Sequence, residues 1–105
     1  MASPAYRLTH DDTVFVNALT VLLLPVIQED DEVRIWHELA IEVRRGVNRD
    51  HTYMGPLVEA FDAWDRAEDV MMRERARLHL VGHLAAFIKW RGALADRARK
   101  TQAAA

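Results

Sequence analysis

One stretch decides the fold of this chain: Leu78-His79-Leu80-Val81-Gly82-His83-Leu84-Ala85-Ala86-Phe87-Ile88-Lys89-Trp90. It lies in a segment, residues 56–100, that has no proline after Pro56 and only two glycines, so a helix is favoured. A helix that packs on one neighbour needs a single apolar stripe, whereas residues 78–90 are apolar on nearly every side. The stretch therefore predicts a helix that is buried against several elements, with a second copy of the chain or a partner protein among them.

The first predicted helix spans residues 11–27. Thr9 can cap its N-terminus, and Asp11 and Asp12 suit the positive end of the helix dipole. Pro25 lacks a backbone N–H, so it is expected to bend or end this helix. The β-branched valines of the segment leave a strand as the alternative.

A second helix is predicted over residues 31–45. Its apolar side chains recur at three- and four-residue spacing along one face, at Val33, Trp36, Ala40 and Val43. Arg44 and Arg45 suit the carbonyl end of the helix, and Gly46 is a natural terminator. Residues 47–55 follow as the one clear loop.

Two further helices are predicted at residues 56–70 and 72–99. Pro56 fits the first turn of a helix. The charged run 73–77 contains no strong helix breaker, so one continuous helix over 56–99 is the alternative. A helix of about 45 residues is long against a mean of about 12, and two helices are therefore favoured.

The chain of 105 residues is expected to form one helical domain. Residues 1–8 are predicted to form a loose N-terminal arm, and residues 101–105 a C-terminal tail. We expect an all-α fold, a small bundle of three or four helices. Two strongly apolar helices are more than so short a chain can cover alone, and this surplus predicts a homodimer.

The composition narrows the possible functions. The formal net charge is -2, with acids and bases mixed along the chain, which is typical neither of a nucleic-acid-binding protein nor of one attracted to anionic lipid. The apolar run 14–27 is shorter than the about 20 residues that cross a bilayer, so no membrane anchor is expected. Cysteine is absent, which fits a reducing compartment, and we expect a cytoplasmic protein. Arginine outnumbers lysine twelve to two, which fits a GC-rich bacterial genome.

Residues that catalysis commonly uses are scarce. The only serine is Ser3, in the predicted arm, and the only lysines are Lys89 and Lys100. The four glycines are scattered, so no phosphate-binding loop is predicted. Glu38, on a mostly apolar helix, is the best single candidate for a catalytic carboxylate. The sequence therefore indicates a protein that is not an enzyme and needs no cofactor.

His79 and His83 form the one pattern that could bind a metal ion. Their i,i+4 spacing places two imidazoles on one face of a helix, a spacing that transition-metal sites use. Neither an HExxH nor a Glu-x-x-His motif accompanies them, so a third ligand has to come from elsewhere in the fold or from another subunit. Plain packing, or packing that responds to pH, is the alternative.

The remaining apolar side chains predict a contact surface for a dimer or a second protein, made of Leu80, Leu84, Phe87, Ile88, Trp90, Met71 and Met72. Trp36 and Trp64 are expected in the core or at its rim. We therefore expect a non-catalytic regulatory or adaptor protein that acts by protein–protein contact, for example by sequestering a partner as small antiactivators do. The alternative is a helical bundle that binds a metal or a small ligand through His79 and His83.

Overall fold

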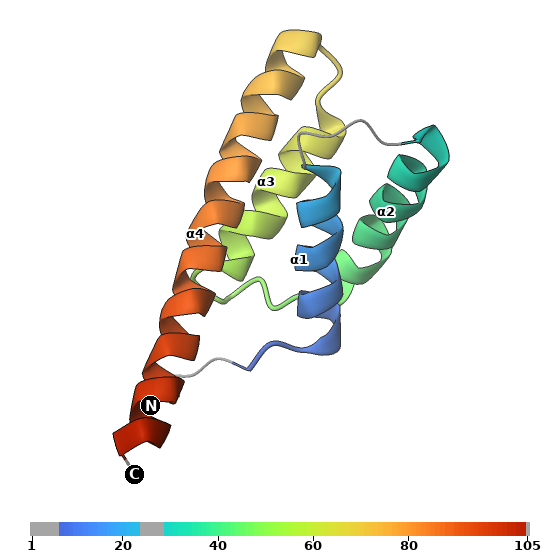
Figure 1. The fold of residues 1–105 in the computed structure, drawn as a ribbon. Coiled ribbons are helices and arrows are strands. Elements are labelled where there is room, and N and C mark those ends of the chain that lie inside the picture. The colour runs from blue at the N-terminus through green and yellow to red at the C-terminus, as the bar shows by residue number, and fades with distance from the viewer. Residues whose placement is uncertain (1–6, 24–28, 105) are drawn as a thin grey trace.

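The computed structural model describes residues 7–23 and 29–104, and within these ranges the chain forms four α-helices, one short 3₁₀ helix and no strand. The helices are α1 (His10–Leu22), α2 (Asp30–Val43), α3 (Met54–Arg66) and α4 (Val70–Ala104), and the 3₁₀ helix η1 (Arg44–Gly46) continues α2. Consecutive helices run in opposite directions, with α1 between α2 and the α3–α4 pair (Figure 1). The expected all-α bundle is thus confirmed in its four-helix form.

Helix α4 sets the length of the molecule. Its 35 residues correspond to about 52 Å at a rise of 1.5 Å per residue, and the longest axis of the molecule is also 52 Å. Its C-terminal part extends past the ends of the other helices (Figure 1). Residues 101–104 of the predicted C-terminal tail (101–105) continue α4.

The N-terminus of α1 is capped as the sequence predicts. The Thr9 hydroxyl accepts a hydrogen bond from the Asp12 N–H (3.1 Å), and the Asp12 carboxylate accepts one from the Thr9 N–H (3.0 Å). This reciprocal capping box satisfies two backbone donors that a helix otherwise leaves without partners. The helix ends at Leu22, whereas Pro25 and the predicted end at residue 27 lie outside the described residues.

The core lies where α1, α3 and α4 meet. Each of these helices contributes a fully buried phenylalanine, namely Phe15, Phe61 and Phe87. The rings of Phe15 and Phe61 pack edge to face with their centroids 5.4 Å apart, a favourable geometry for an aromatic pair. Leu8, from the predicted N-terminal arm (1–8), is half-buried against this core, and residues 1–6 lie outside the described ranges. Trp36 and Trp64 are partly buried at the rim of the core, as expected.

Helix α3 begins at Met54, two residues before the predicted start at Pro56. A side chain of the preceding loop explains the difference. His51 Nδ1 accepts hydrogen bonds from the backbone N–H groups of Tyr53 (3.2 Å) and Met54 (3.3 Å). The imidazole thus takes the part that a serine or aspartate side chain commonly plays at a helix start. Upstream, regular α2 ends at Val43 rather than at residue 45, because η1 carries the chain to Gly46.

The prediction of two helices within residues 56–99 is confirmed, and a continuous helix is excluded. The break lies at residues 67–69 rather than between 70 and 72. Asp69 starts α4, because its carboxylate accepts a hydrogen bond from the Met71 N–H (3.3 Å). The charged run 73–77 is helical throughout, as the predicted helix at 72–99 requires.

Candidate functional site

The α4 residues predicted as a contact surface divide between two faces of the helix. Leu80, Leu84 and Phe87 are only 0%, 7% and 0% exposed, so the prediction of these three as surface anchors is wrong. Their face packs into the core, mainly against α3. Residues 78–90 are apolar on several sides of the helix. The fold of one chain fully buries only the side that carries Leu80, Leu84 and Phe87.

Trp90 belongs to an aromatic cluster that joins α4 to the loop before α3. Its ring stacks on Tyr53 with the centroids 5.2 Å apart and 19° between the ring planes. The ring centroids of His51 and Phe87 lie 4.8 Å and 5.5 Å from that of Trp90. Trp90, predicted on the contact surface, is therefore half-buried by its own chain.

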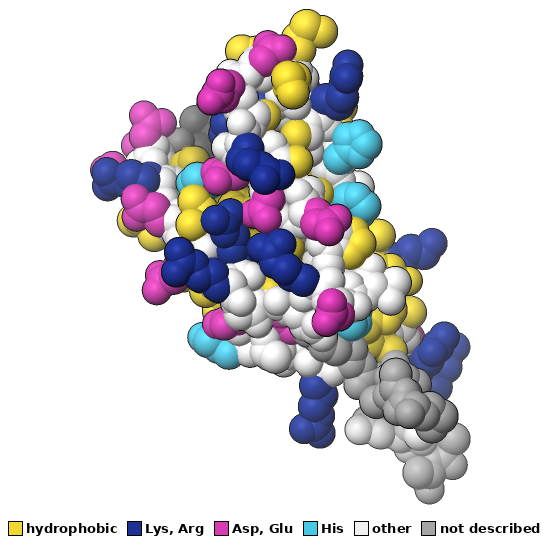
Figure 2. All heavy atoms as spheres, turned by 180° about the vertical axis from the view of Figure 1, so that it is seen from behind, with side chains coloured by type: hydrophobic (Ala, Val, Ile, Leu, Met, Phe, Trp, Pro, Cys, Tyr) yellow, Lys and Arg dark blue, Asp and Glu magenta, His cyan; other side chains and the backbone are white. Residues whose placement is uncertain are grey.

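The exposed side of α4 carries six large hydrophobic side chains: Val70, Met71, Met72, Leu78, Val81 and Ile88. Met71 is 73% exposed, Leu78 58% and Ile88 41%. Figure 2 shows hydrophobic side chains at the end of the molecule where α4 begins and again lower along the same edge. Of the predicted contact residues, Met71, Met72 and Ile88 are thus accessible on the surface.

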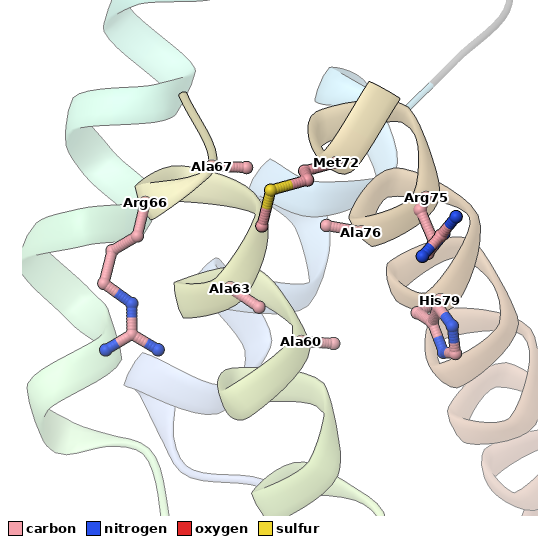
Figure 3. A pocket seen from close by; sticks show the side chains of 8 residues that line it. All are labelled: Ala60, Ala63, Arg66, Ala67, Met72, Arg75, Ala76 and His79. Carbon is pink, nitrogen blue, oxygen red and sulfur yellow. The ribbon is translucent and has the colours of Figure 1, made fainter. Parts of the chain in front are cut away.

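A hollow between α3 and the first turns of α4 adjoins this surface (Figure 3). Its volume is about 430 Å³, and it is lined by Ala60, Ala63, Arg66, Ala67, Met72, Arg75, Ala76 and His79. The Met72 side chain reaches from α4 toward α3, whereas Arg66 and Arg75 extend outward on the two sides (Figure 3). We call this hollow the α3–α4 groove. Its four alanines make the floor apolar, and its two arginines make the edges basic.

His79 and His83 lie on one face of α4, as their spacing predicts, beside a shallow hollow that Leu78 and Gly82 also line. His79 is exposed and His83 is half-buried. Among the described residues, no group of three or more His, Cys, Asp or Glu side chains is placed to hold a metal ion. Within this part of the chain the pair therefore offers two ligands, and further ligands have to come from another molecule.

Two side-chain pairs join α2 and η1 to α3. His37 Nε2 lies 2.7 Å from Asp65 Oδ1, and Arg44 donates to Asp62 Oδ1 at 2.7 Å. These pairs are partly buried and hold α2 and η1 against α3, so they are structural contacts between consecutive elements. Glu38, the candidate catalytic carboxylate, is exposed to solvent and lacks the dry surroundings that an active-site carboxylate needs.

The capping role of His51 is what sequence reasoning missed. Burial lowers the pKa of its imidazole below the ordinary value of 6.5, and the negative charge of Asp12 partly opposes this effect. The lowered pKa favours the neutral ring, which keeps the Nδ1 lone pair that caps α3. One signal could have pointed to this role, because His51 stands three residues before Met54, at the spacing of a capping side chain.

None of the helices in the described ranges is both long and apolar enough to cross a membrane. No protein-family model, curated protein or solved structure matches the chain. The candidate functional site is the exposed side of α4 with the adjoining α3–α4 groove, because exposed hydrophobic side chains and an apolar hollow lie together there.

Proposed function

We propose that this chain is a non-catalytic regulatory or adaptor protein that acts by protein–protein contact, for example by sequestering a partner. The observation that carries the proposal is the run of exposed large hydrophobic side chains along α4, with Met71 73% and Leu78 58% exposed. Single apolar side chains are common on protein surfaces, whereas six large ones exposed along one helix favour an interaction site. A cytoplasmic location belongs to the same proposal and is supported by the absence of cysteine.

The α3–α4 groove indicates the chemistry of the partner. Its alanine floor admits apolar side chains, and Met72 can adapt its shape because the unbranched thioether has several rotatable bonds. Arg66 and Arg75 flank the groove and favour acidic groups on either side of the inserted residues. The partner segment is therefore an amphipathic helix with an apolar face and acidic flanks, bound in the helix-in-groove mode.

The test uses a pair of matched variants in affinity purification from the host. Ala63 is exposed and lines the groove, so Ala63→Trp fills the groove without entering the core. Ala98 is exposed near the far end of α4, so Ala98→Trp adds the same side chain away from the groove. We expect one protein to be retained by wild type and Ala98→Trp and to be lost with Ala63→Trp. Its purified form should then bind wild type with an affinity that falls at least about tenfold in the groove variant.

The proposal fails if the proteins retained by Ala63→Trp and by wild type are the same. It also fails if the purified candidate binds both variants equally. Far-UV circular dichroism of the two variants controls for loss of fold.

A second candidate is a bundle that binds a small ligand or a metal beside His79 and His83. The volume of the α3–α4 groove, about 430 Å³, favours it, because small-molecule sites commonly measure about 300–1,000 Å³. For a metal site, a chelator should lower the melting temperature and His83→Ala should reproduce that loss. For the contact function proposed above, the chelator should leave the melting temperature unchanged.

A further inference from the structure

A regular pattern runs along the exposed side of α4. Eight residues follow one another at alternating three- and four-residue spacing: Met71, Glu74, Leu78, Val81, Ala85, Ile88, Gly92 and Ala95. All eight are exposed, and we call them the α4 seam. Alternating three- and four-residue spacing is the heptad pattern by which two helices pack along their length. At 1.5 Å per residue the seam is about 36 Å long.

The seam is open to a second helix. Of the residues that bury α4 within its own chain, Leu80 and Phe87 lie on the other side of the helix, and Leu84 lies at the edge of the seam. Figure 1 shows α4 along one edge of the molecule, with the other helices grouped to one side of it. At Gly82 and Gly92, no atom other than those of the adjoining residues and backbone of α4 lies within 4 Å of the position that a Cβ would occupy, so another backbone can approach closely there.

We propose that the seam is closed by a second copy of this chain, with the two α4 helices antiparallel about a two-fold axis near His83. This inference rests on the proposed function only in treating α4 as a contact surface. In this register the seam residues of one copy face those of the other in four kinds of layer: Met71 with Ala95, Glu74 with Gly92, Leu78 with Ile88, and Val81 with Ala85.

Side-chain size favours the antiparallel register. Met71, Glu74 and Val81 each face a small residue of the second copy, so large and small side chains alternate across the seam. A parallel pair in register would place Ala85 on Ala85 and Gly92 on Gly92, which leaves voids, since protein interiors pack without gaps. In the antiparallel pair, Val81 and Glu74 of one copy fill the space beside Ala85 and Gly92 of the other.

Charge also favours the antiparallel register. A parallel pair in register would place Glu74 directly against Glu74 of the second copy, and facing like charges destabilise a helix pair. In the antiparallel pair, Glu74 lies beside Arg91 of the second copy, on the same flank of the seam. Glu74 already accepts two hydrogen bonds from Arg77 in its own helix (2.6 Å and 2.9 Å), so its carboxylate lies between Arg77 and Arg91 of the second copy and offsets the repulsion between them.

The opposite flank of the seam has one unfavourable pair, which provides a sharp test. In the antiparallel register Lys89 lies beside Arg75 of the second copy, and both residues are exposed. Lys89→Glu changes this repulsion into attraction at two symmetric places. In a parallel pair the same position would lie beside Leu84, which is buried in its own core, and the substitution would have little effect.

The first experiment is sedimentation equilibrium of wild type, Ile88→Asp and Lys89→Glu at low salt. We expect wild type to dimerise at tens of micromolar or below and Ile88→Asp to be monomeric with unchanged far-UV circular dichroism. Lys89→Glu should dimerise about fivefold or more tightly than wild type. A wild type that stays monomeric overturns the inference, as does a dimer that survives Ile88→Asp or weakens in Lys89→Glu.

The second experiment determines the direction of the helices, and a chain without cysteine allows it directly. Val81→Cys and Ala85→Cys are each oxidised alone and as a mixture. The antiparallel register predicts a disulfide-linked dimer in the mixture only, because Val81 faces Ala85 of the second copy. Cross-linking of each variant with itself would overturn the register in favour of a parallel pair. These results are separable from the groove test, because Ala63→Trp leaves every seam residue unchanged.

Discussion

Gly55 and Gly82 are both helical glycines, and the structure predicts opposite effects when each is replaced by alanine. Gly55 is buried in the first turn of α3. A Cβ added there would lie 2.2 Å from the carbonyl oxygen of Arg49, whereas real Cβ contacts are essentially never shorter than 3.0 Å. The atom in the way belongs to the backbone, so no side-chain rotation relieves the clash. Gly82 is exposed in the middle of α4, with nothing within 4 Å of the same position.

The local hydrogen bonds make the clash at Gly55 costly. The Gly55 N–H donates to the His51 carbonyl oxygen at 2.9 Å, and the His51 N–H donates to that of Asn48 at 3.3 Å. The loop therefore cannot move away from α3 without stretching these bonds. Overpacking of this kind costs about 1–3 kcal/mol, which in a domain of this size lowers the melting temperature by roughly 5–20 °C. Gly82→Ala should instead stabilise the protein by about 0.5–1 kcal/mol, because alanine is the better residue in a helix interior.

The assay is urea and thermal unfolding followed by far-UV circular dichroism, at a protein concentration low enough to keep the chain monomeric. Both variants are compared with wild type in the same buffer. Equal effects of the two substitutions, or a Gly55→Ala variant as stable as wild type, would refute the reasoning. A Gly55→Ala variant as stable as wild type would mean that the loop before α3 yields at little cost.

Two further predictions concern the loop and the core. Burial lowers the pKa of His51 in the folded state below 6.5. The unfolded chain therefore binds the proton more readily than the folded chain does. The stability that the neutral ring supplies is present above about pH 6.5 and is lost as pH falls toward the folded-state pKa. Urea unfolding at pH 7.5 and 5.0 should show a smaller loss for His51→Asn, which keeps a capping acceptor, than for wild type, and equal losses would contradict the capping role. Leu80→Ala should lower the free energy of unfolding by about 2–5 kcal/mol because Leu80 is fully buried. Leu78 is 58% exposed, so Leu78→Ala should change the stability of the monomer by no more than about 0.5 kcal/mol. Similar losses of stability for the two variants in urea unfolding would contradict the assignment of the two faces of α4.

Much of the local structure of this chain could be predicted from short-range signals. Thr9 and Asp12 indicate the start of α1, because these two residues lie three positions apart and form a capping box. The break before α4 lies about three residues earlier than predicted, because residues 67–69 contain neither glycine nor proline and only the cap at Asp69 marks it. The capping histidine before α3 was missed, since histidine is not among the usual capping residues.

The candidate site could be predicted only in outline. The two accessible methionines and Ile88 were expected on a contact surface, and they are exposed. The α3–α4 groove could not be foreseen, because its lining comes from two helices whose relative position depends on the break at residues 67–69. The cluster of His51, Tyr53 and Trp90 likewise joins residues far apart in the chain.

By itself the sequence determined that this protein is helical, where most of its helices begin, and that one of them has more apolar surface than a single neighbour can cover. Only the tertiary structure decided which side of that helix is buried. Residues 78–90 are apolar around most of the helix, so their pattern favours no side. The choice depends on packing at a distance, because Phe15 and Phe61 complete a core around Leu80 and Phe87 and leave Leu78, Val81 and Ile88 facing solvent.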